Sequence, residues 1–423
     1  MRAWLLLASL GLVFSVHPDV ALAQAPSTPQ TAEGAVRVFL DCNFSCDDTY
    51  TRREITFVDY VRDRRDADVH ILITTQDTGG GGTEYTIKFI GLVRFANVEQ
   101  TLRLVTPATS TSDERRKGIT EVLKRGLVRY VAESPVAPRI RITLADDGTK
   151  TGQQDPAKDP WNLWAFSAEF GGGLDGEQSS KSHSIRGHLS ANRTTDALKV
   201  QISVNGSYRE NRFELGEGET FTSTSRSFTN NALIAKSLTK KFSAAVVTRA
   251  SSSTFVNQDF AFRAAGGVEY DLFPYSESTR RLLTFQYTIG FDYFDYKEET
   301  VFAKTSETLA DHRLQTSLSM RQPWGSSFAS VSFSQFLTKP SKYSITAFGD
   351  ANVRLFKGFS FNVFGEVART RDQLYLRRGE ASTEEILVRQ RQLATGYRYF
   401  MQIGISYSFG SIFNNVVNPR FGS

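Results

Sequence analysis

Two cysteines are the side chains with the most evident chemistry in this 423-residue sequence. Cys42 and Cys46 stand in the stretch DCNFSCDD, beside three aspartates. A structural zinc site needs four nitrogen or sulfur ligands, and the nearest histidine downstream is His70. A thioredoxin-like site has two residues between its cysteines, whereas three separate them here. The spacing therefore predicts a disulfide that closes a short loop, with metal binding and redox chemistry as the alternatives.

A second set of charged side chains is spread over residues 161–410, where polar and apolar positions alternate. Because successive side chains of a β-strand point to opposite faces, these charges would share one face. We expect this face to line the inside of a barrel, where it would form any path for a solute. Its predicted members are Glu169, Arg186, His188, Arg249, Arg263, Glu269, Arg313, Asp350, Glu366 and Arg398.

Three roles for this polar face stay open. Its charges have both signs and could simply pair with each other and with water in a narrow interior. An excess of arginines would instead favour anionic solutes in a passive channel. A lipid esterase would need a serine beside an oriented histidine, and His188 lies near Ser190, but no G-x-S-x-G stretch accompanies them. We therefore expect no enzyme, no catalytic residue, no cofactor and no metal.

The same alternation divides residues 161–410 into twelve strand-like segments. Each is long enough for an outer-membrane strand, which needs about 9 to 11 residues in the hydrocarbon layer. Aromatic residues gather near many segment ends, as they do at membrane interfaces. The even number predicts a twelve-stranded antiparallel transmembrane β-barrel. The segments are 161–174, 182–194, 198–213, 222–238, 241–255, 258–273, 281–297, 309–322, 327–338, 342–356, 359–373 and 397–410.

The connections between these segments alternate in length. Short turns such as QPWGS and FKG alternate with longer loops such as LRRGEASTEEILVRQRQLATG, although FVNQ and TKPSK are short members of the second set. Outer-membrane barrels have short turns on the periplasmic side and longer loops outside. We therefore expect the short turns to lie beside the part of the chain that precedes the barrel.

The rest of the chain divides by composition. A basic start, a short apolar core and an A-L-A site predict a secretory signal peptide over 1–23. Residues 24–35 are rich in proline, serine and threonine and predict a flexible leader. Residues 146–160 predict a linker, and 411–423 form a C-terminal tail after the barrel.

Residues 36–145 mix strands with helices and predict an α+β domain with the order β-α-β-β-β-α-β. Apolar spacing predicts a first helix over 52–63, and Ser112 is the expected N-cap of a second helix. The stretch PRIRITLA, 138–145, is the expected last strand. Helices would cover one face of the resulting sheet.

Three resemblances to known proteins add to these predictions. The element order of 36–145 resembles small periplasmic domains of TolB-like and curli-assembly-like proteins, which implies an adaptor. The block VEYDLFPYSESTRRLLTFQYTIGFDYF, 268–294, resembles the salt-induced outer-membrane-protein family of unknown function. That likeness implies a location and a fold. The segment YFMQIGISYSFG resembles the signal that barrel-assembly machinery recognises in a last strand, with Gln402, Gly404, Tyr407 and Phe409 as its matching residues.

The sequence thus predicts a protein of the Gram-negative envelope, located in the outer membrane with its N-terminal domain in the periplasm. We expect a structural or porin-like role, as a passive channel for small solutes that would include anions. An envelope scaffold is the alternative, and a lipid esterase is a remote one. The expected partners are outer-membrane lipid, the barrel-assembly machinery, and a periplasmic protein or peptidoglycan, with no nucleic acid.

Overall fold

The computed structural model describes residues 34–42, 46–142, 159–216, 219–379, 392–413 and 415. The predicted signal peptide, nearly all of the leader and most of the linker lie outside these ranges. Within them, no helix combines the length and the apolar character needed to cross a membrane.

The N-terminal part forms a five-stranded sheet with the order β2-β1-β3-β4-β5. Strand β1 is parallel to both β2 and β3, and the remaining neighbours are antiparallel. The elements are β1 (Arg37–Asp41), α1 (Asp48–Glu54), β2 (Asp59–Tyr60), η1 (Arg64–Asp66), β3 (Val69–Asp77), β4 (Thr83–Gly91), η2 (Val93–Phe95), β5 (Glu99–Thr106), α2 (Ser112–Val131) and η3 (Ala137–Arg139).

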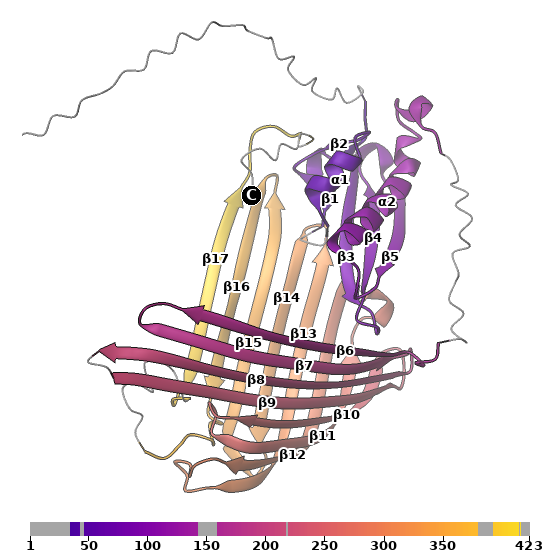
Figure 1. The fold of residues 1–423 in the computed structure, drawn as a ribbon. Helices are drawn as coiled ribbons and strands as arrows, with labels where there is room; N and C mark the ends of the chain where they lie inside the picture. The colour runs from indigo at the N-terminus through magenta and orange to yellow at the C-terminus, as the bar shows by residue number, and fades with distance from the viewer. Residues whose placement is uncertain are drawn as a thin grey trace, which may run out of the picture.

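The core of this domain lies between the sheet and its two helices, which cover the same face (Figure 1). The Tyr130 side chain of α2 is fully buried, and its hydroxyl donates to the carbonyl oxygens of Phe89 and Val98 at 3.3 and 3.1 Å. The other fully buried residues of this core include Val38, Ile55, Ile71, Ile87, Leu123 and Leu127.

Two predicted elements of this domain are wrong. The helix expected over 52–63 is α1, which ends at Glu54, and an irregular stretch with a bend at 57–58 leads into β2. Ile55 and Val58 are buried, but they pack from this irregular stretch. The strand expected over 138–145 is absent as far as residue 142, because η3 occupies its beginning.

The second helix begins one residue earlier than expected. Thr111 is its N-cap and accepts a hydrogen bond from the backbone N–H of Glu114, whose carboxylate accepts from the Thr111 N–H in return. This reciprocal capping box satisfies two backbone donors that the first turn cannot use.

Residues from 164 onward form a twelve-stranded antiparallel sheet in which every strand pairs with its sequence neighbours. The twelve predicted strands are confirmed, with ends that differ by a few residues. They are β6 (Trp164–Gly176), β7 (Ser180–Thr194), β8 (Leu198–Gly216), β9 (Glu219–Ser237), β10 (Phe242–Ser253), β11 (Gln258–Asp271), β12 (Arg281–Tyr296), β13 (Ser306–Gln322), β14 (Gly325–Phe336), β15 (Lys339–Phe356), β16 (Phe359–Thr370) and β17 (Tyr397–Tyr407), with η5 (Tyr275–Glu277) between β11 and β12.

The predicted closed barrel differs from the observed sheet. Strands β6 and β17 are its two edges and do not pair with each other. In Figure 1 the first strands run at a steep angle to the last ones, and ladder hydrogen bonds need neighbouring strands to be nearly aligned. The sheet is therefore strongly curved but open.

One packing contact in the small domain gives a direct test. A Cβ atom added at Gly126 of α2 would lie 2.0 Å from the ring of Phe89, so the helix could not keep its place on the sheet. Gly126→Ala should therefore destabilise the domain by about 1–3 kcal/mol. Hydrogen exchange of the β4 amides in the full chain should become faster.

Gly118→Ala is the matched control on the same helix. Its Cβ would meet only the Leu104 side chain, at 3.2 Å, and alanine favours a helix by up to about 1 kcal/mol. If the β4 amides exchange at the same rate in the two variants, the clash at Gly126 does not weaken the packing of the helix on the sheet.

Candidate functional site on the polar face of the sheet

The pairing registers place all ten predicted polar-face residues on one face of the large sheet. Glu169 lies opposite His188 on the neighbouring strand, and Arg249 lies opposite Arg263. Residues that lie opposite each other share a face, and following these positions from strand to strand places all ten residues on the same face. The opposite face is apolar and exposed, as Ile289 and Phe291 show at 51% and 65% exposure. This distribution is the reverse of a soluble sandwich, in which the apolar face is buried.

Two of the ten residues meet in a buried ion cluster. The Arg263 guanidinium bonds Asp311 at 3.0 and 3.1 Å and the Thr288 hydroxyl at 3.1 Å. Arg313 bonds the same Asp311 at 2.8 Å and Asp292 at 3.2 Å. Both aspartates and Arg263 are less than a tenth exposed. The sequence analysis missed Asp311, although it stands two positions before Arg313 and so shares its face.

Residues 371–379, in the connection between β16 and β17, lie over this cluster and are called the strap. The Val301 N–H donates to the carbonyl oxygen of Leu376 in the strap at 2.8 Å, and Thr300 forms a β-bridge with Arg377. Leu374 is 2% exposed. Under the strap lies a cavity of about 230 Å³ lined by Arg249, Arg263, Asp292, Arg313, Asp372 and Tyr375. Burial raises the pKa of the Asp372 carboxyl, which favours its neutral form.

Arg249 differs from its neighbours in this cavity. Within the described part of the chain it forms no ion pair and no side-chain hydrogen bond, whereas Arg263 and Arg313 are both paired. Its direct cross-strand partner is Arg263, another cation. Among the residues that the structure describes, no carboxylate contacts the charge of this arginine.

The other predicted residues are spread along the face. His188 Nδ1 lies 2.7 Å from the Asn205 side-chain oxygen, and Arg186 lines the same open depression as Glu169. Glu366 pairs with Arg398, while Glu269 accepts a hydrogen bond from Gln286. Asp350 has no polar partner within the described ranges. The structure thus gathers Arg263 and Arg313 into the ion cluster with Arg249 beside it. It pairs Glu366 with Arg398 and brings Glu169, Arg186 and His188 to one depression.

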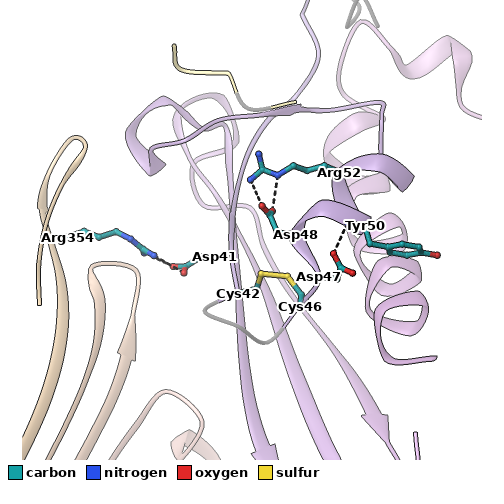
Figure 2. The surroundings of a disulfide bond; sticks show 8 residues. All are labelled: Asp41, Cys42, Cys46, Asp47, Asp48, Tyr50, Arg52 and Arg354. Atoms are coloured by element: carbon teal, nitrogen blue, oxygen red, sulfur yellow. Dashed lines mark hydrogen bonds and ion pairs between the residues drawn. A yellow bond between two sulfur atoms is a disulfide. The ribbon is translucent and has the colours of Figure 1, made fainter. Parts of the chain in front are cut away.

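The small domain packs against the end of the sheet that carries the short turns. Arg354 of β15 bonds both carboxylate oxygens of Asp41, at 2.6 and 2.8 Å (Figure 2). Its guanidinium carbon lies 5.1 Å from the ring centre of Phe39. His70 Nε2 is 3.1 Å from the same carboxylate, and Arg64 Nε is 3.1 Å from His70 Nδ1. The side chains of Arg354, Asp41, His70 and Arg64 are therefore linked in one hydrogen-bonded series that joins the two parts of the protein.

The protonation states of Asp41 and His70 follow from these contacts. Burial alone would raise the pKa of Asp41, but hydrogen bonds from Arg354 and His70 outweigh it and lower that pKa to about 2. Burial lowers the pKa of His70 despite the raising effect of Asp41. A neutral His70 accepts from Arg64 through Nδ1 and donates to Asp41 through Nε2.

The predicted disulfide between Cys42 and Cys46 is present, directly after Asp41 (Figure 2). Asp47, next to the second cysteine, caps α1 by accepting from the Tyr50 N–H at 2.8 Å. Both sulfurs are bonded to each other and so are not free thiols.

The predicted assembly signal lies on and just after the last strand. Gln402 and Gly404 share the polar face, whereas Tyr407 lies on the apolar face and its ring stacks on Phe409 at 5.6 Å. Beyond this strand the tail turns toward the small domain: the Arg62 guanidinium bonds the carbonyl oxygen of Phe409 at 2.8 Å. Residue 414 and residues 416–423 of the tail lie outside the described ranges.

Comparison with known proteins identifies no family for this chain. No family model matches it, and no curated protein matches it. Among solved structures, a NanC porin aligns over 57% of this chain and 99% of its own length, at 9% identity and a TM-score of 0.27. The translocator domain of the autotransporter NalP from Neisseria meningitidis aligns over 58% of this chain and 82% of its own, at 10% identity and a TM-score of 0.20. These scores are too low for either likeness to bear on fold or function.

The contact between the two parts can be tested by removing its arginine. Arg354→Ala leaves the Asp41 carboxylate buried without its strongest partner, and breaking a buried pair in this way costs about 3 kcal/mol. Amides of β1 and of the 356–359 turn should exchange faster with deuterium in the detergent-solubilised full chain.

Arg398→Ala removes a polar-face arginine whose ion pair with Glu366 lies within the sheet. This control should leave β1 protection at the wild-type level. If Arg354→Ala also leaves it there, the ion pair does not hold the two parts together.

Proposed function

We propose that the chain is an outer-membrane protein whose twelve-stranded sheet spans the bilayer and holds the small domain on the periplasmic side. The observation that carries this proposal is the exposed apolar face that runs across the large sheet. On β17 alone, Met401, Ile403 and Ile405 are 67%, 61% and 67% exposed. A contiguous apolar surface of this size is unfavourable in water and favourable against lipid chains.

The dimensions of the sheet fit the same proposal. Its strands have 11 to 19 residues, and a tilted membrane strand uses about 9 to 11 of them in the hydrocarbon layer. A membrane leaves no water to satisfy unpaired strand edges, so β6 and β17 would have to pair in the bilayer. Closure of the observed open sheet into a barrel is thus part of the proposal.

The position of the small domain supports an anchoring role. It contacts the short turn at 356–359 and Arg321 at the end of β13, and none of its described contacts reaches the strap at the other end. Short turns face the periplasm in outer-membrane barrels. The domain would therefore be presented to a periplasmic protein or to peptidoglycan, as an adaptor. Its resemblance to TolB-like domains, and that of 268–294 to the salt-induced family, stay predictions.

Accessibility labelling in intact Gram-negative cells tests the location and orientation. Ser179 lies in the turn between β6 and β7, at the end of the sheet away from the small domain. Ser179→Cys should therefore react with a membrane-impermeant maleimide on whole cells. Lys240→Cys, in a short turn, should react only after the outer membrane has been permeabilised. The native cysteines are joined in a disulfide and do not compete for the reagent. Equal labelling of both sites on intact cells would contradict the proposed span.

A passive channel for small anionic solutes is a second candidate, favoured by Arg249 on the polar face, which has no ion-pair partner among the described residues. In planar bilayers the purified protein should then show discrete conductance steps with a preference for chloride over potassium. Arg249→Ala should lower that preference, because the unpaired cation attracts anions into the lumen. Arg369→Ala, on the outer apolar face, is the control and should leave it unchanged. A stable bilayer without openings would rule out this second role.

A further inference from the structure

A cavity of about 450 Å³ lies between the small domain and the short-turn end of the large sheet. The segment around η1 forms one wall, and the ends of β14, β15, β16 and the residues after β17 form the other. This volume is in the range of small-molecule sites, which are commonly about 300–1,000 Å³. The lining residues that matter for its chemistry are Arg62, Arg64, Arg65, Arg354, Trp324 and Phe356.

The cavity carries an excess of positive charge. Four arginines line it, but Asp63 is its one lining carboxylate within the described ranges. Asp63 is already engaged, since it accepts hydrogen bonds from the backbone N–H groups of Arg65 and Gly358. Arg354 is neutralised from behind by Asp41. Like charges in a confined site repel one another unless an anion lies among them.

Several donors of these arginines have no partner in the described structure. The Nε atom of Arg62 is buried and forms no hydrogen bond, although its two terminal nitrogens bond the carbonyl oxygens of Phe409 and Gly410. Arg64 uses Nε for His70 and forms no other side-chain hydrogen bond. Arg65 reaches only the Leu355 carbonyl oxygen, at 3.5 Å. Of these donors, Arg62 Nε is the one recorded as buried, and a buried donor without an acceptor is costly, so an acceptor group fits beside it.

Aromatic rings form the rest of the lining. Phe356 and Phe359 stack with ring centres 4.5 Å apart, and Phe39 and Trp324 complete this wall. Flat apolar surfaces beside a group of guanidinium donors suit a ligand with one anionic end and one apolar end.

We propose that this cavity is a binding site for a phosphate monoester that carries an apolar or aromatic group. Phosphate offers three acceptor oxygens and nearly two negative charges, which match several arginine forks better than a carboxylate does. The bound phosphate would contact the small domain through Arg64 and Arg65 and would face Arg354 from the sheet. This inference goes beyond the proposed anchoring role and does not require the sheet to span a membrane.

Titration calorimetry with phenyl phosphate tests the site. The full chain is kept in phosphate-free maltoside micelles, and Arg64→Gln and Arg65→Gln are compared with the wild type. Each substitution removes a charge-assisted hydrogen bond donor and should weaken binding about tenfold or more. Arg65 is exposed and makes one long contact, so its variant should keep the wild-type hydrogen-exchange pattern.

Arg53→Gln, an exposed arginine of the same domain outside the cavity, is the matched control and should bind like the wild type. Inorganic phosphate should bind more weakly than phenyl phosphate, because it lacks the group that contacts the aromatic wall. No binding of phenyl phosphate, or equal loss in Arg53→Gln and Arg65→Gln, would overturn the proposal. Equal binding of the two phosphates would overturn its aromatic part.

A second arm separates a lipid from a soluble source of the phosphate. The full chain is placed in phosphatidylcholine nanodiscs with and without phosphatidic acid, which presents a phosphate monoester. If the natural ligand is a lipid, phosphatidic acid should block phenyl phosphate binding to the wild type. If the ligand is soluble, the titration should be the same in both nanodiscs. Either result supports the site and assigns its source.

Discussion

The buried ion pair between Asp41 and Arg354 is the interaction on which the relation of the two parts depends. The small sheet has helices on one face only, so its other face needs a different cover. That face carries Phe39, Asp41 and His70, all nearly inaccessible to solvent. Arg354 supplies the charge for Asp41 and the planar contact for Phe39 with one side chain. Without it, a carboxylate would remain in an apolar setting with only a neutral imidazole beside it.

The two sheets bury opposite faces of their amphipathic strands. In the small domain the apolar faces turn inward, against α2 and against the large sheet. In the large sheet the apolar face is outside, and buried charge is concentrated on the inner face, where Arg263, Asp292 and Asp311 satisfy each other. An ion cluster of this kind needs every member, since the removal of one leaves the others unpaired in a poorly solvated place. The strap over the cluster limits the access of water further.

The sequence predicted the large sheet well because a two-residue period over many strands has few alternative interpretations. The face of each strand position followed from the same alternation, and so did the common face of the ten polar residues. The small domain was less predictable. Ile55, Val58 and Val61 have a spacing that suits a helix, yet Ile55 and Val58 lie in an irregular connection and Val61 forms a bridge to Phe413. The helix predicted over 52–63 also included Arg62, and it gave no indication that Arg62 shares a cavity with Arg64 and Arg65 of η1.

Contacts between distant segments could not be predicted from one sequence. Asp41 and Arg354 are 313 positions apart, and nothing in the local pattern of either strand indicates its partner. The open edges of the large sheet are a further difference, since strand count and parity favour closure but do not determine the angle at which the first and last strands meet.

The residues after β17 have a consequence for the order of folding. Asn415 bonds the Tyr60 N–H and the Asp59 carboxylate, and Phe413 forms a bridge to Val61, so the outermost strand of the small sheet obtains its partner from residues about 355 positions later. Because synthesis proceeds from the N-terminus, β2 is made long before this partner exists. The outer edge of β2 in the small domain therefore stays unpaired until the residues after β17 have been made. Correct completion of the small domain would then report that the large sheet has been finished.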